Sequence, residues 1–254
     1  MTYQEENELM AAWTDIANAM FESGAEVKRI EKSLYLLAQS HGATNISSFT
    51  INSNINMTCT FPDGNIVSQS RRIVNYPSFD LKRFEELNEI SRKCCETKAG
   101  AAEIREMLKK TEVPKSPKRL LIGAVIVGFA FSLFFGGGFA DAIVSAILGG
   151  LIVVADRTLG RYLPNTIIYN FVMAFMLGII SGLTCKAFPM LNNDKILIGD
   201  IMLLVPGLFI TGAMRDMLTG DTISGTMRFI ESILWAGALA MGFITAFLVI
   251  GGNV

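Results

Sequence analysis

The chain has 254 residues, of which 51% are hydrophobic and 18% are charged, and its formal net charge is −1. A nearly neutral chain lacks the basic surface that nucleic acid binding needs, which excludes nucleic acid as the expected partner. The charges are unevenly spread: up to Arg119 there are 16 basic and 16 acidic residues, and the rest of the chain holds only 6 and 7. The first part therefore predicts a water-soluble domain, and the second is too poor in charge to be covered by water.

Residues 1–112 are predicted to form an α+β domain that stays in the cytoplasm, since acidic residues stand where a signal peptide would be basic. Hydrophobic residues at helical spacing over 9–20 and 27–37, separated by Ser23-Gly24, predict a helical hairpin. A small antiparallel sheet is predicted from the strand patterns of 45–51, 55–61 and 65–75. Residues 80–111 then predict a long helix that leads to the membrane.

No residue pattern in the chain predicts catalysis. His41, the single histidine, is expected at a helix C-terminus, and the adjacent Cys94-Cys95 are interpreted as small helix residues in preference to a redox pair. Nucleotide-binding loops, nucleophile motifs and metal-ligand spacings are absent from the sequence. We therefore expect no enzyme activity, no cofactor and no metal, and a membrane-bound hydrolase is a distant hypothesis.

A linker at 113–119 is predicted where Pro114 and Pro117 interrupt helix and basic residues cluster. After it, three uncharged stretches of 21, 24 and 23 residues exceed the roughly 20 residues that cross a bilayer as a helix, and two shorter runs lie between them. The fold class is thus an α-helical integral membrane protein with an N-terminal α+β cytoplasmic domain. About five transmembrane segments are expected in 120–254, at about 120–140, 141–156, 163–186, 196–215 and 229–251.

Charged residues bound each of the two shorter runs. Asp141 precedes the first and Asp156-Arg157 follow it, while Asp200 precedes the second and Arg215-Asp216 follow it. One interpretation is that these charges mark the membrane edges. The other is a weak internal repeat of the kind that builds a central site in transporters. The sequence leaves both open.

Pro206-Gly207 interrupts the middle of the second short run. Proline removes a backbone donor and glycine permits a bend, so the segment is either kinked or broken around a substrate. A half-helix that begins near Pro206 would direct its amide groups at an anionic ligand. Thr211 and Arg215 lie within a few residues of this point.

Basic residues predict the orientation of the segments. With five crossings and the N-terminus inside, seven basic residues lie on the cytoplasmic side and only Lys186 and Lys195 lie outside, which fits the positive-inside rule. The C-terminus is then outside. Three crossings with two re-entrant loops are the alternative.

Several segments stand in a distinctive order over nearly the whole chain: residues 23–31 (SGAEVKRIE), the turn 61–64, the basic pair Arg71-Arg72, and 205–207 (VPG) followed by Arg215-Asp216 and by 220–225. Together they resemble the threonine/serine exporter family (ThrE). The chain is most similar to the N-terminal-half component of the split, two-protein (YjjP-like) type.

That resemblance implies a secondary exporter of small polar metabolites in the cytoplasmic membrane, either threonine and serine or dicarboxylates such as succinate. It also implies a small partner membrane protein that supplies the second transporter half in a hetero-oligomer. Proton-motive force is the expected coupling, and Asp200, if buried, is a candidate carrier of the coupling proton. The expected transport path contains Asp200, Pro206, Gly207, Thr211, Arg215 and Asp216, and the secondary candidates are Asp141, Asp156, Arg157, Glu26 and Arg29.

A membrane-anchored sensor or regulator is the competing hypothesis. In it, the cytoplasmic domain binds a ligand and the membrane segments serve only for assembly. Five segments with a central Pro-Gly break exceed what an anchor requires, so transport is the preferred interpretation.

Overall fold

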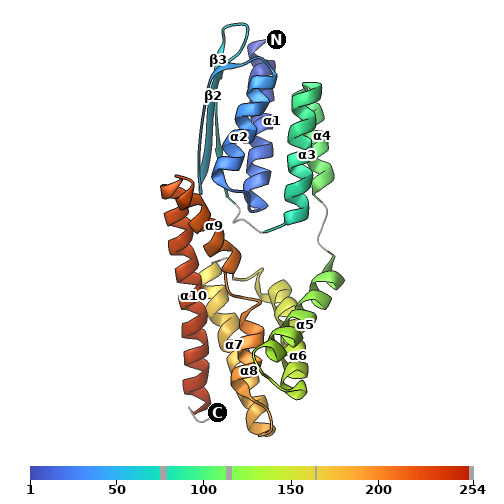
Figure 1. Ribbon diagram of the computed structural model, residues 1–254, viewed down its shortest axis with the longest axis vertical. Coiled ribbons are helices and arrows are strands. Elements are labelled where there is room, and N and C mark those ends of the chain that lie inside the picture. Colours follow the sequence, from blue (N-terminus) through green and yellow to red (C-terminus); the bar gives the residue numbers. More distant parts are fainter. Residues whose placement is uncertain (75–78, 113–115, 164, 252–254) are drawn as a thin grey trace. The chain divides into compact units, whose positions relative to one another are not determined.

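A computed structural model describes residues 1–74, 79–112, 116–163 and 165–251 (Figure 1). The predicted strand end at Asn75, Pro114 and Lys115 of the linker, and residues 252–254 lie outside the described residues. The chain divides into two compact units. Unit 1 holds residues 1–113 and 208–229, and unit 2 holds 114–207 and 230–254.

Unit 1 begins with the predicted helical hairpin, α1 (Tyr3–Glu22) and α2 (Val27–Ser40). Thr2 and Glu5 form a capping box that satisfies backbone donors at the start of α1. The turn between the helices depends on Gly24, whose φ of +90° is open to glycine and strained for other residues. A Cβ at Gly24 would also lie 2.7 Å from the Phe79 ring, so the backbone approaches this ring closely.

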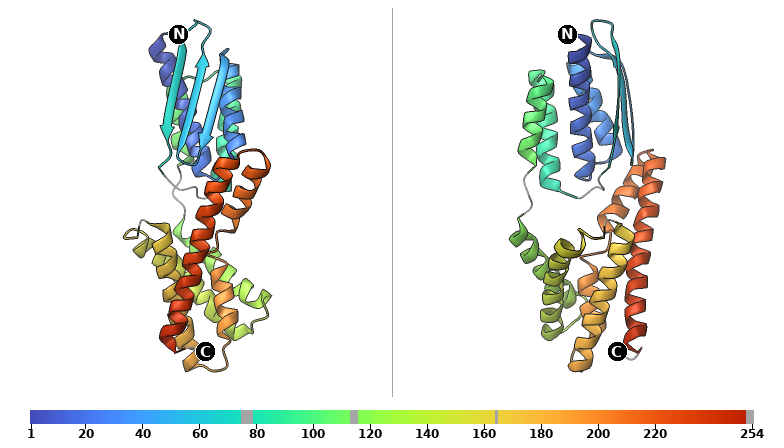
Figure 2. Two further views of the ribbon diagram at one scale, coloured as in Figure 1. Left: turned by 90° about the vertical axis from the view of Figure 1, so that its left-hand side faces the viewer. Right: turned by 180° about the vertical axis from the view of Figure 1, so that it is seen from behind.

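A three-stranded antiparallel sheet follows in the order β1–β2–β3, as the alternating pattern predicts. Its strands are β1 (Thr44–Ile51), β2 (Asn54–Thr60) and β3 (Ile66–Arg72). Ile55, Met57 and Cys59 of β2 point to the buried face, while the residues between them are more exposed. Helices α1 and α2 cover that face (Figure 2, left).

The predicted long helix over 80–111 is wrong, since the structure has two helices, α3 (Leu81–Thr97) and α4 (Ala101–Thr111). Lys98 adopts a left-handed conformation with φ of +51°, and Gly100 takes the N-cap position of α4. The break turns the chain back, so that buried residues of both helices, Cys94 and Ile104, join the same core. A single straight helix would leave one of them in water.

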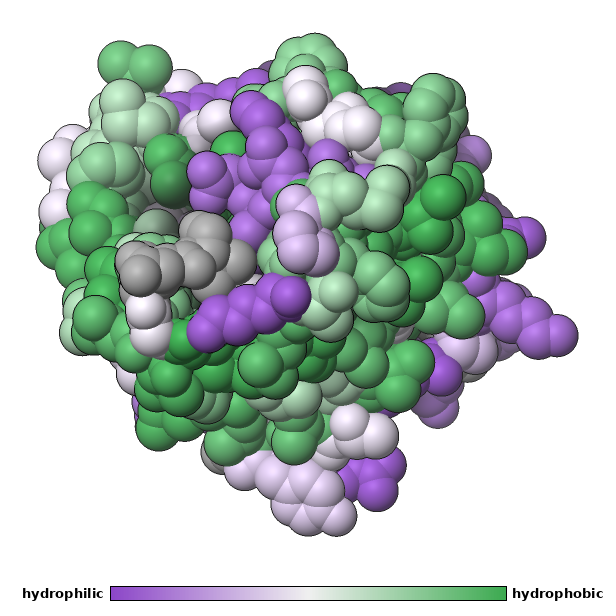
Figure 3. Space-filling model, turned by 90° about the horizontal axis from the view of Figure 1, so that it is seen from below, coloured by the Kyte–Doolittle hydropathy of each residue, from purple (hydrophilic) through white to green (hydrophobic). Residues whose placement is uncertain are grey.

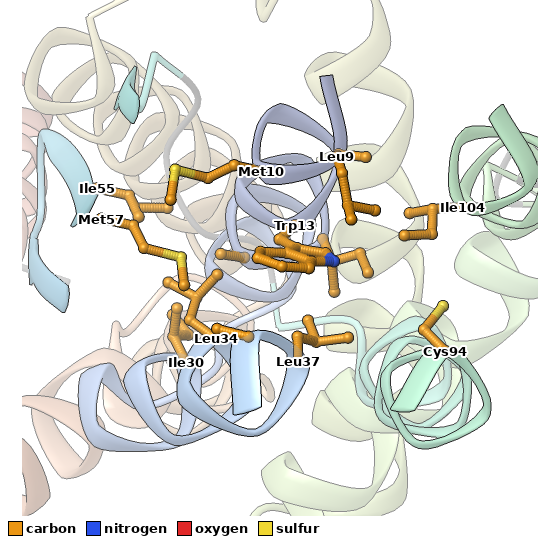
Figure 4. Packing of buried hydrophobic residues seen from close by; sticks show 14 of the residues in the cluster. Leu9, Met10, Trp13, Ile30, Leu34, Leu37, Ile55, Met57, Cys94 and Ile104 are labelled. Atoms are coloured by element: carbon orange, nitrogen blue, oxygen red, sulfur yellow. The ribbon is translucent and has the colours of Figure 1, made fainter. Parts of the chain in front are cut away.

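The core of unit 1 is centred on Trp13 of α1. Figure 4 shows Trp13 between Leu34 and Leu37 of α2 and, from α4, Ile104. Met57 of β2 lies on the side of the sheet in the same view. Helices α1 and α2 thus form a middle layer, with the sheet on one face and the pair α3 and α4 on the other (Figure 1).

Unit 1 also contains α9 (Gly207–Leu218), apart from its first residue, and the start of α10 (Thr222–Ile250). The glycine Gly220, with φ of +103°, lies in the turn between these two helices. A segment distant in sequence therefore joins the N-terminal domain, which the composition of 120–254 did not predict.

Four helices are long and apolar enough to cross a membrane among the described residues, and they make this an integral membrane protein. They are α5 (Pro117–Phe134), α6 (Phe139–Leu159), α7 (Thr166–Ala187) and α10. Large hydrophobic side chains on all four are exposed, as expected for contact with lipid. Figure 3 shows hydrophobic residues prevailing over the face seen from below, interrupted by hydrophilic patches.

Small residues bring the helices of unit 2 together. Helices α5 and α6 are antiparallel and meet where Gly128 lies against Ser145 and Gly149 lies against Ala124. In contrast, α7 and α10 are parallel: Gly178 lies against Ala246 and Gly182 against Ile250, so both sequences advance in the same direction. Gly178 and Gly182 therefore permit the close approach of α7 and α10.

Two predicted segments differ from the helices observed. The short run at 141–156 is part of α6, a 21-residue helix that continues past Asp156 to Leu159, because polar ends of a membrane helix can reach the interface. The segment at 196–215 is two helices, α8 (Asn193–Ile201) and α9, separated by a non-helical stretch that ends at Pro206. Proline cannot supply the donor that would continue α8.

Candidate functional site

The predicted site residues do not form one cluster. Asp200, Pro206 and Gly207 lie in unit 2, whereas Thr211, Arg215 and Asp216 lie in unit 1. Three polar features of the described residues deserve separate description: a cluster around Asp216, a groove beside Arg29, and a cluster around Asp200.

The Asp216 cluster consists of Asp216, Arg228, Asn52 and the N-terminus of α2. Asp216 is fully buried, and its Oδ2 lies 2.9 Å from the guanidinium of Arg228, which is itself 6% exposed. Arg228 also donates to Asn52 at 3.3 Å and lies 4.6 Å from the centre of the Phe21 ring. The other oxygen, Oδ1, accepts from the backbone N–H of Val27 at 3.4 Å.

The Val27 contact has a local cause in the sequence. Glu26 is the N-cap of α2 and makes no capping hydrogen bond with its side chain, so no cap side chain accepts from the first amide groups of α2. Asp216 supplies an acceptor from 189 residues away, and a carboxylate suits the positive end of the helix dipole. Glu26 instead forms an ion pair with Arg215.

Further contacts join α9 and α10 to the same part of unit 1. Lys28 donates to the carbonyl of Thr219 at 2.9 Å, and Ser224 donates to the carbonyl of Thr50 at 3.4 Å. Thr50 in turn donates from its amide to Glu31 at 2.9 Å. The segment 23–31 and the segment 215–228, which carry much of the family resemblance, therefore face each other inside unit 1.

A groove of about 480 Å³ lies between α2 and α3. Arg29, Lys32 and Arg92 line it together with Glu96, so basic groups prevail in its lining. Arg29 donates twice to the side-chain oxygen of Asn88, at 3.0 and 2.8 Å. Small-molecule sites have volumes in this range, and the charge fits an anionic ligand.

The cysteines beside this groove are not activated. Burial raises the pKa of the Cys94 thiol to about 11, and it also raises the pKa of Cys95, which lines the groove. Both groups are therefore thiols at neutral pH, whereas a reactive cysteine needs a thiolate. This agrees with the interpretation of the pair as small helix residues.

The Asp200 cluster lies where α5, α6 and α8 meet. Asp200 and Ser145 are both fully buried, and Ser145 Oγ lies 2.8 Å from Asp200 Oδ1 and 3.0 Å from the carbonyl oxygen of Gly128. A Cβ at Gly199 would lie 2.5 Å from Ser145 Oγ, so glycine is required for this close approach. The hydroxyl of Ser132, also fully buried, lies nearby without a hydrogen-bond partner among the described residues.

Three of the secondary candidates, Asp141, Asp156 and Arg157, lie near the ends of α6. Asp141, at the start of α6, accepts backbone N–H groups from Gly138 and Asn192, each at 2.8 Å, and so joins two turns. Asp156 accepts from the hydroxyl of Tyr169 at 2.9 Å near the other end of α6, and Arg157 beside it is exposed. Asp141 and Asp156 hold turns and helix ends, which are structural roles.

The remaining predicted residues lie around the break before α9. Pro206 is buried and Gly207 is exposed, and the Thr211 hydroxyl donates to the carbonyl of Leu208 within α9 at 3.0 Å. Among the residues that the structure describes, no three His, Cys, Asp or Glu side chains gather closely enough to hold a metal ion.

The sequence matches the family described as "Putative threonine/serine exporter" over residues 12–250. The chain belongs to the threonine/serine exporter family. The match spans both units, and this is a family of transporters.

Two relatives carry the family name. The "Threonine/serine exporter" of Corynebacterium glutamicum is 25% identical over 170 residues, which cover 63% of this chain and 35% of that protein. The "Probable threonine/serine exporter" of Mycobacterium tuberculosis (strain ATCC 25618 / H37Rv) is 24% identical over 235 residues, which cover 90% of this chain and 44% of that protein. The matched region is thus less than half of either relative. No solved structure matches the chain.

Several residues of these clusters were missed by reasoning from sequence. Arg228 stands next to the last apolar stretch and reads as a membrane-edge charge, while Ser145 lies inside an uncharged run with no pattern around it. Asn52 is one of several polar residues in a predicted turn. A buried carboxylate is commonly paired with a cation, so a prediction that Asp216 is buried would have been the one signal pointing to Arg228.

Proposed function

We propose that this chain is part of a secondary transporter that exports small polar metabolites across the cytoplasmic membrane. Threonine and serine are the first candidates, and dicarboxylates such as succinate are the second. The observation that carries the proposal is family membership over residues 12–250, in a chain with four apolar helices. The buried polar cluster at Asp200 supports it further, because ionisable groups inside a membrane bundle are costly and commonly mark a transport path.

The chain crosses the membrane five times in this proposal, with the N-terminal domain in the cytoplasm and the C-terminus outside. Support comes from the parallel direction of α7 and α10, because the chain must return across the bundle between them. The return path is α8 and the non-helical stretch before Pro206. Broken helices of this kind surround substrate or ion sites in other secondary transporters.

A second membrane protein supplies the rest of the transporter and forms a hetero-oligomer with this chain. The support is the resemblance to the split, two-protein type; the matched region makes up 35% and 44% of the two relatives' length. We expect that partner to complete the substrate path beside α8 and the Pro206 break.

The predicted path residues take two roles in this scheme. Asp200, Pro206 and Gly207 belong to the broken segment and face the path. Arg215 and Asp216, in the last turn of α9, hold that helix against the 23–31 segment of the cytoplasmic domain, through Glu26 and the N-terminus of α2. They transmit movement between that domain and the helices that follow it.

The test is metabolite efflux from cells that express the chain, the partner, or both, at matched membrane levels. Export of threonine, serine or a dicarboxylate only when both are present is the expected result, and it would identify the substrate. Efflux at full rate from this chain alone would refute the two-component arrangement. No change in any small metabolite, despite correct assembly, would refute export.

Arg215→Ala is expected to abolish export and to leave expression and membrane insertion intact. The Arg215 side chain is 66% exposed, so its loss removes the ion pair to Glu26 without disturbing a core. The measurement is threonine efflux from cells together with the amount of chain in the membrane. Full efflux would remove Arg215 from the mechanism, and Lys110→Ala, an equally exposed ion-pair loss in α4, is the matched control.

A ligand-sensing role for the N-terminal domain is the second candidate, and the groove beside Arg29 favours it. Its basic lining suits a carboxylate or phosphate compound. Charge reversal of Arg92 to Glu should then weaken the dependence of efflux on cytoplasmic metabolite concentration while the maximal rate persists. An unchanged dependence would leave the groove without a function.

A further inference from the structure

Two buried carboxyl groups of unit 2 have different surroundings. Each oxygen of Asp141 accepts a backbone N–H at 2.8 Å, which is the arrangement that suits an ionised carboxylate. Asp200 has no such donors: Oδ1 contacts only the Ser145 hydroxyl, and Oδ2 is buried with no hydrogen-bond partner among the described residues. The site of Asp200 is therefore poorly suited to a negative charge.

The Ser145 hydroxyl has two neighbours and one proton. It lies within hydrogen-bond distance of the Gly128 carbonyl and of Asp200 Oδ1. If Asp200 is ionised, both neighbours are acceptors and one of the two contacts has no proton. If Asp200 is protonated, it donates to Ser145, which donates to Gly128, and both contacts become hydrogen bonds. The geometry thus matches the neutral acid.

Close packing holds this relay in place. A Cβ at Gly199 would lie 2.5 Å from Ser145 Oγ and 3.0 Å from the Gly128 carbonyl oxygen. A Cβ at Gly128 would lie 2.6 Å from the backbone carbonyl of Ser145. The three positions are therefore fixed by direct backbone contact of α5, α6 and α8.

No nearby charge compensates Asp200 among the residues that the structure describes. The ionisable groups of the surrounding helices lie near the ends of those helices. They are Lys118 and Arg119 of α5, Asp141, Asp156 and Arg157 of α6, Tyr169, Cys185 and Lys186 of α7, and Asp194 and Lys195 of α8 itself. None of them forms an ion pair or hydrogen bond with Asp200 in the described residues.

Asp200 also stands at a point where the chain can bend. It lies in the last turn of α8, one residue before the helix ends, and its carbonyl accepts from the amide of Leu203 at 3.1 Å in the turn that follows. The non-helical stretch then runs to Pro206. Hinges of moving segments occur at such element ends, so a small rotation of α8 would open the relay to one side of the bundle.

We propose that Asp200 holds an exchangeable proton through the relay Asp200–Ser145–Gly128, and that this proton is the ion whose movement drives export. The inference rests on the proposed transport function and assigns the coupling step to named atoms. The proton leaves Asp200 Oδ1 to the cytoplasm when the bend opens the site to that side, and a proton from outside replaces it when the site opens to the outside. Export of one substrate is then linked to proton entry.

The protonation state can be tested without transport. Infrared spectroscopy of the full chain in lipid nanodiscs at neutral pH should show the carbonyl stretch of a protonated, hydrogen-bonded carboxylic acid. Asp200→Asn should remove this band, and Ser145→Ala should shift it to the frequency of an acid without a partner. Ser181→Ala is the matched control, because Ser181 is another fully buried serine that bonds Asn193 and not Asp200. A spectrum without the band, or a band that persists in Asp200→Asn, overturns the relay.

The coupling role is tested in liposomes that contain the chain and its partner. Wild-type export should accelerate at least tenfold when an inwardly directed proton gradient is imposed. Outward substrate flow should in turn move protons inward. Asp200→Asn should lose both responses, whereas the Ser181→Ala control should keep them. A variant that keeps gradient-driven export, or wild-type export driven by a sodium gradient alone, overturns the coupling.

These two measurements separate the failure of the inference from that of the proposed function. If liposomes that contain the wild-type chain and its partner move no substrate, export is refuted. The infrared band then tests the relay independently of transport. If Asp200→Asn does not assemble, Ser145→Ala takes its place, because it keeps the acid and removes only the hydroxyl.

Discussion

At the residue scale, unit 1 contains a buried ion pair between Asp216 and Arg228. Both groups are almost completely removed from water, and each has further partners: the amide of Val27 for Asp216, and Asn52 and the Phe21 ring for Arg228. A buried pair of this kind need not be more stable than an apolar replacement, but the loss of one member leaves the other charge buried alone.

Arg228→Met is expected to lower the free energy of unfolding of unit 1 by about 3–5 kcal/mol, the usual cost of leaving one buried charge unpaired. Asp216→Asn combined with Arg228→Met should cost less than the sum of the two single changes, since neither charge then remains. The measurement is thermal unfolding of the purified chain in detergent, followed by circular dichroism. Arg215→Ala, which removes an exposed pair, is the control. Equal effects of Arg228→Met and Arg215→Ala would show that the buried pair contributes nothing special.

Sequence reasoning reached one side of this cluster and not the other. Glu26, Arg215 and Asp216 were singled out because they stand in recognisable segments. Arg228 and Ser145 were not, since a hydrogen bond between residues far apart in sequence leaves no local pattern. Ser145 meets Asp200 across 55 positions, and a serine inside an apolar run is compatible with many roles in a helix bundle.

At the element scale, the lengths of the apolar stretches predicted the middles of the membrane helices and missed the residues at which helices end or break. The uncharged stretches located α5, α7 and α10 because about 20 apolar residues are needed to cross the bilayer. Charge marks a boundary poorly, so α6 continues beyond Asp156 and α10 begins at Thr222, seven residues before the predicted start. The break at Lys98 depends on a left-handed residue that is not glycine, for which the sequence offers no clear signal.

The parallel packing of α7 on α10 predicts different effects of the same substitution at two glycines, Gly178 at the helix contact and Gly237 away from it. A Cβ at Gly178 would lie 2.6 Å from the Cβ of Ala246, and neither atom can rotate away, whereas a Cβ at Gly237 would meet nothing within 4 Å. Gly178→Ala should therefore lower the unfolding temperature of the bundle in detergent and reduce export. Gly237→Ala should be neutral, or stabilising by up to about 1 kcal/mol through helix propensity. Equal tolerance of both changes would mean that α7 and α10 do not pack as described.

At the scale of the whole chain, the direction of the helices constrains how it crosses the membrane. Helices α7 and α10 advance side by side in the same direction, from Gly178 against Ala246 to Gly182 against Ile250. Residues 188–221 must therefore carry the chain back from the end of α7 to the start of α10. Helix α8 has nine residues and covers about 13 Å, less than half of the roughly 30 Å of hydrocarbon. The non-helical stretch after it and α9, whose 12 residues cover about 18 Å, supply the rest of the path.

Cysteine labelling from the two sides of the membrane tests this path. In a chain whose four native cysteines are replaced, Asp194→Cys in the first turn of α8 should react with an impermeant maleimide added outside. Thr219→Cys in the turn after α9 should react only after the cells are opened, because the intervening segment has crossed the membrane. Arg161→Cys, between α6 and α7, is the internal control and should behave as Thr219→Cys does. If Asp194→Cys and Thr219→Cys react from the same side, residues 188–221 form a re-entrant loop. Helices α7 and α10 could then not both span the membrane in the parallel arrangement, so the same result would also refute the packing from which the five crossings were inferred.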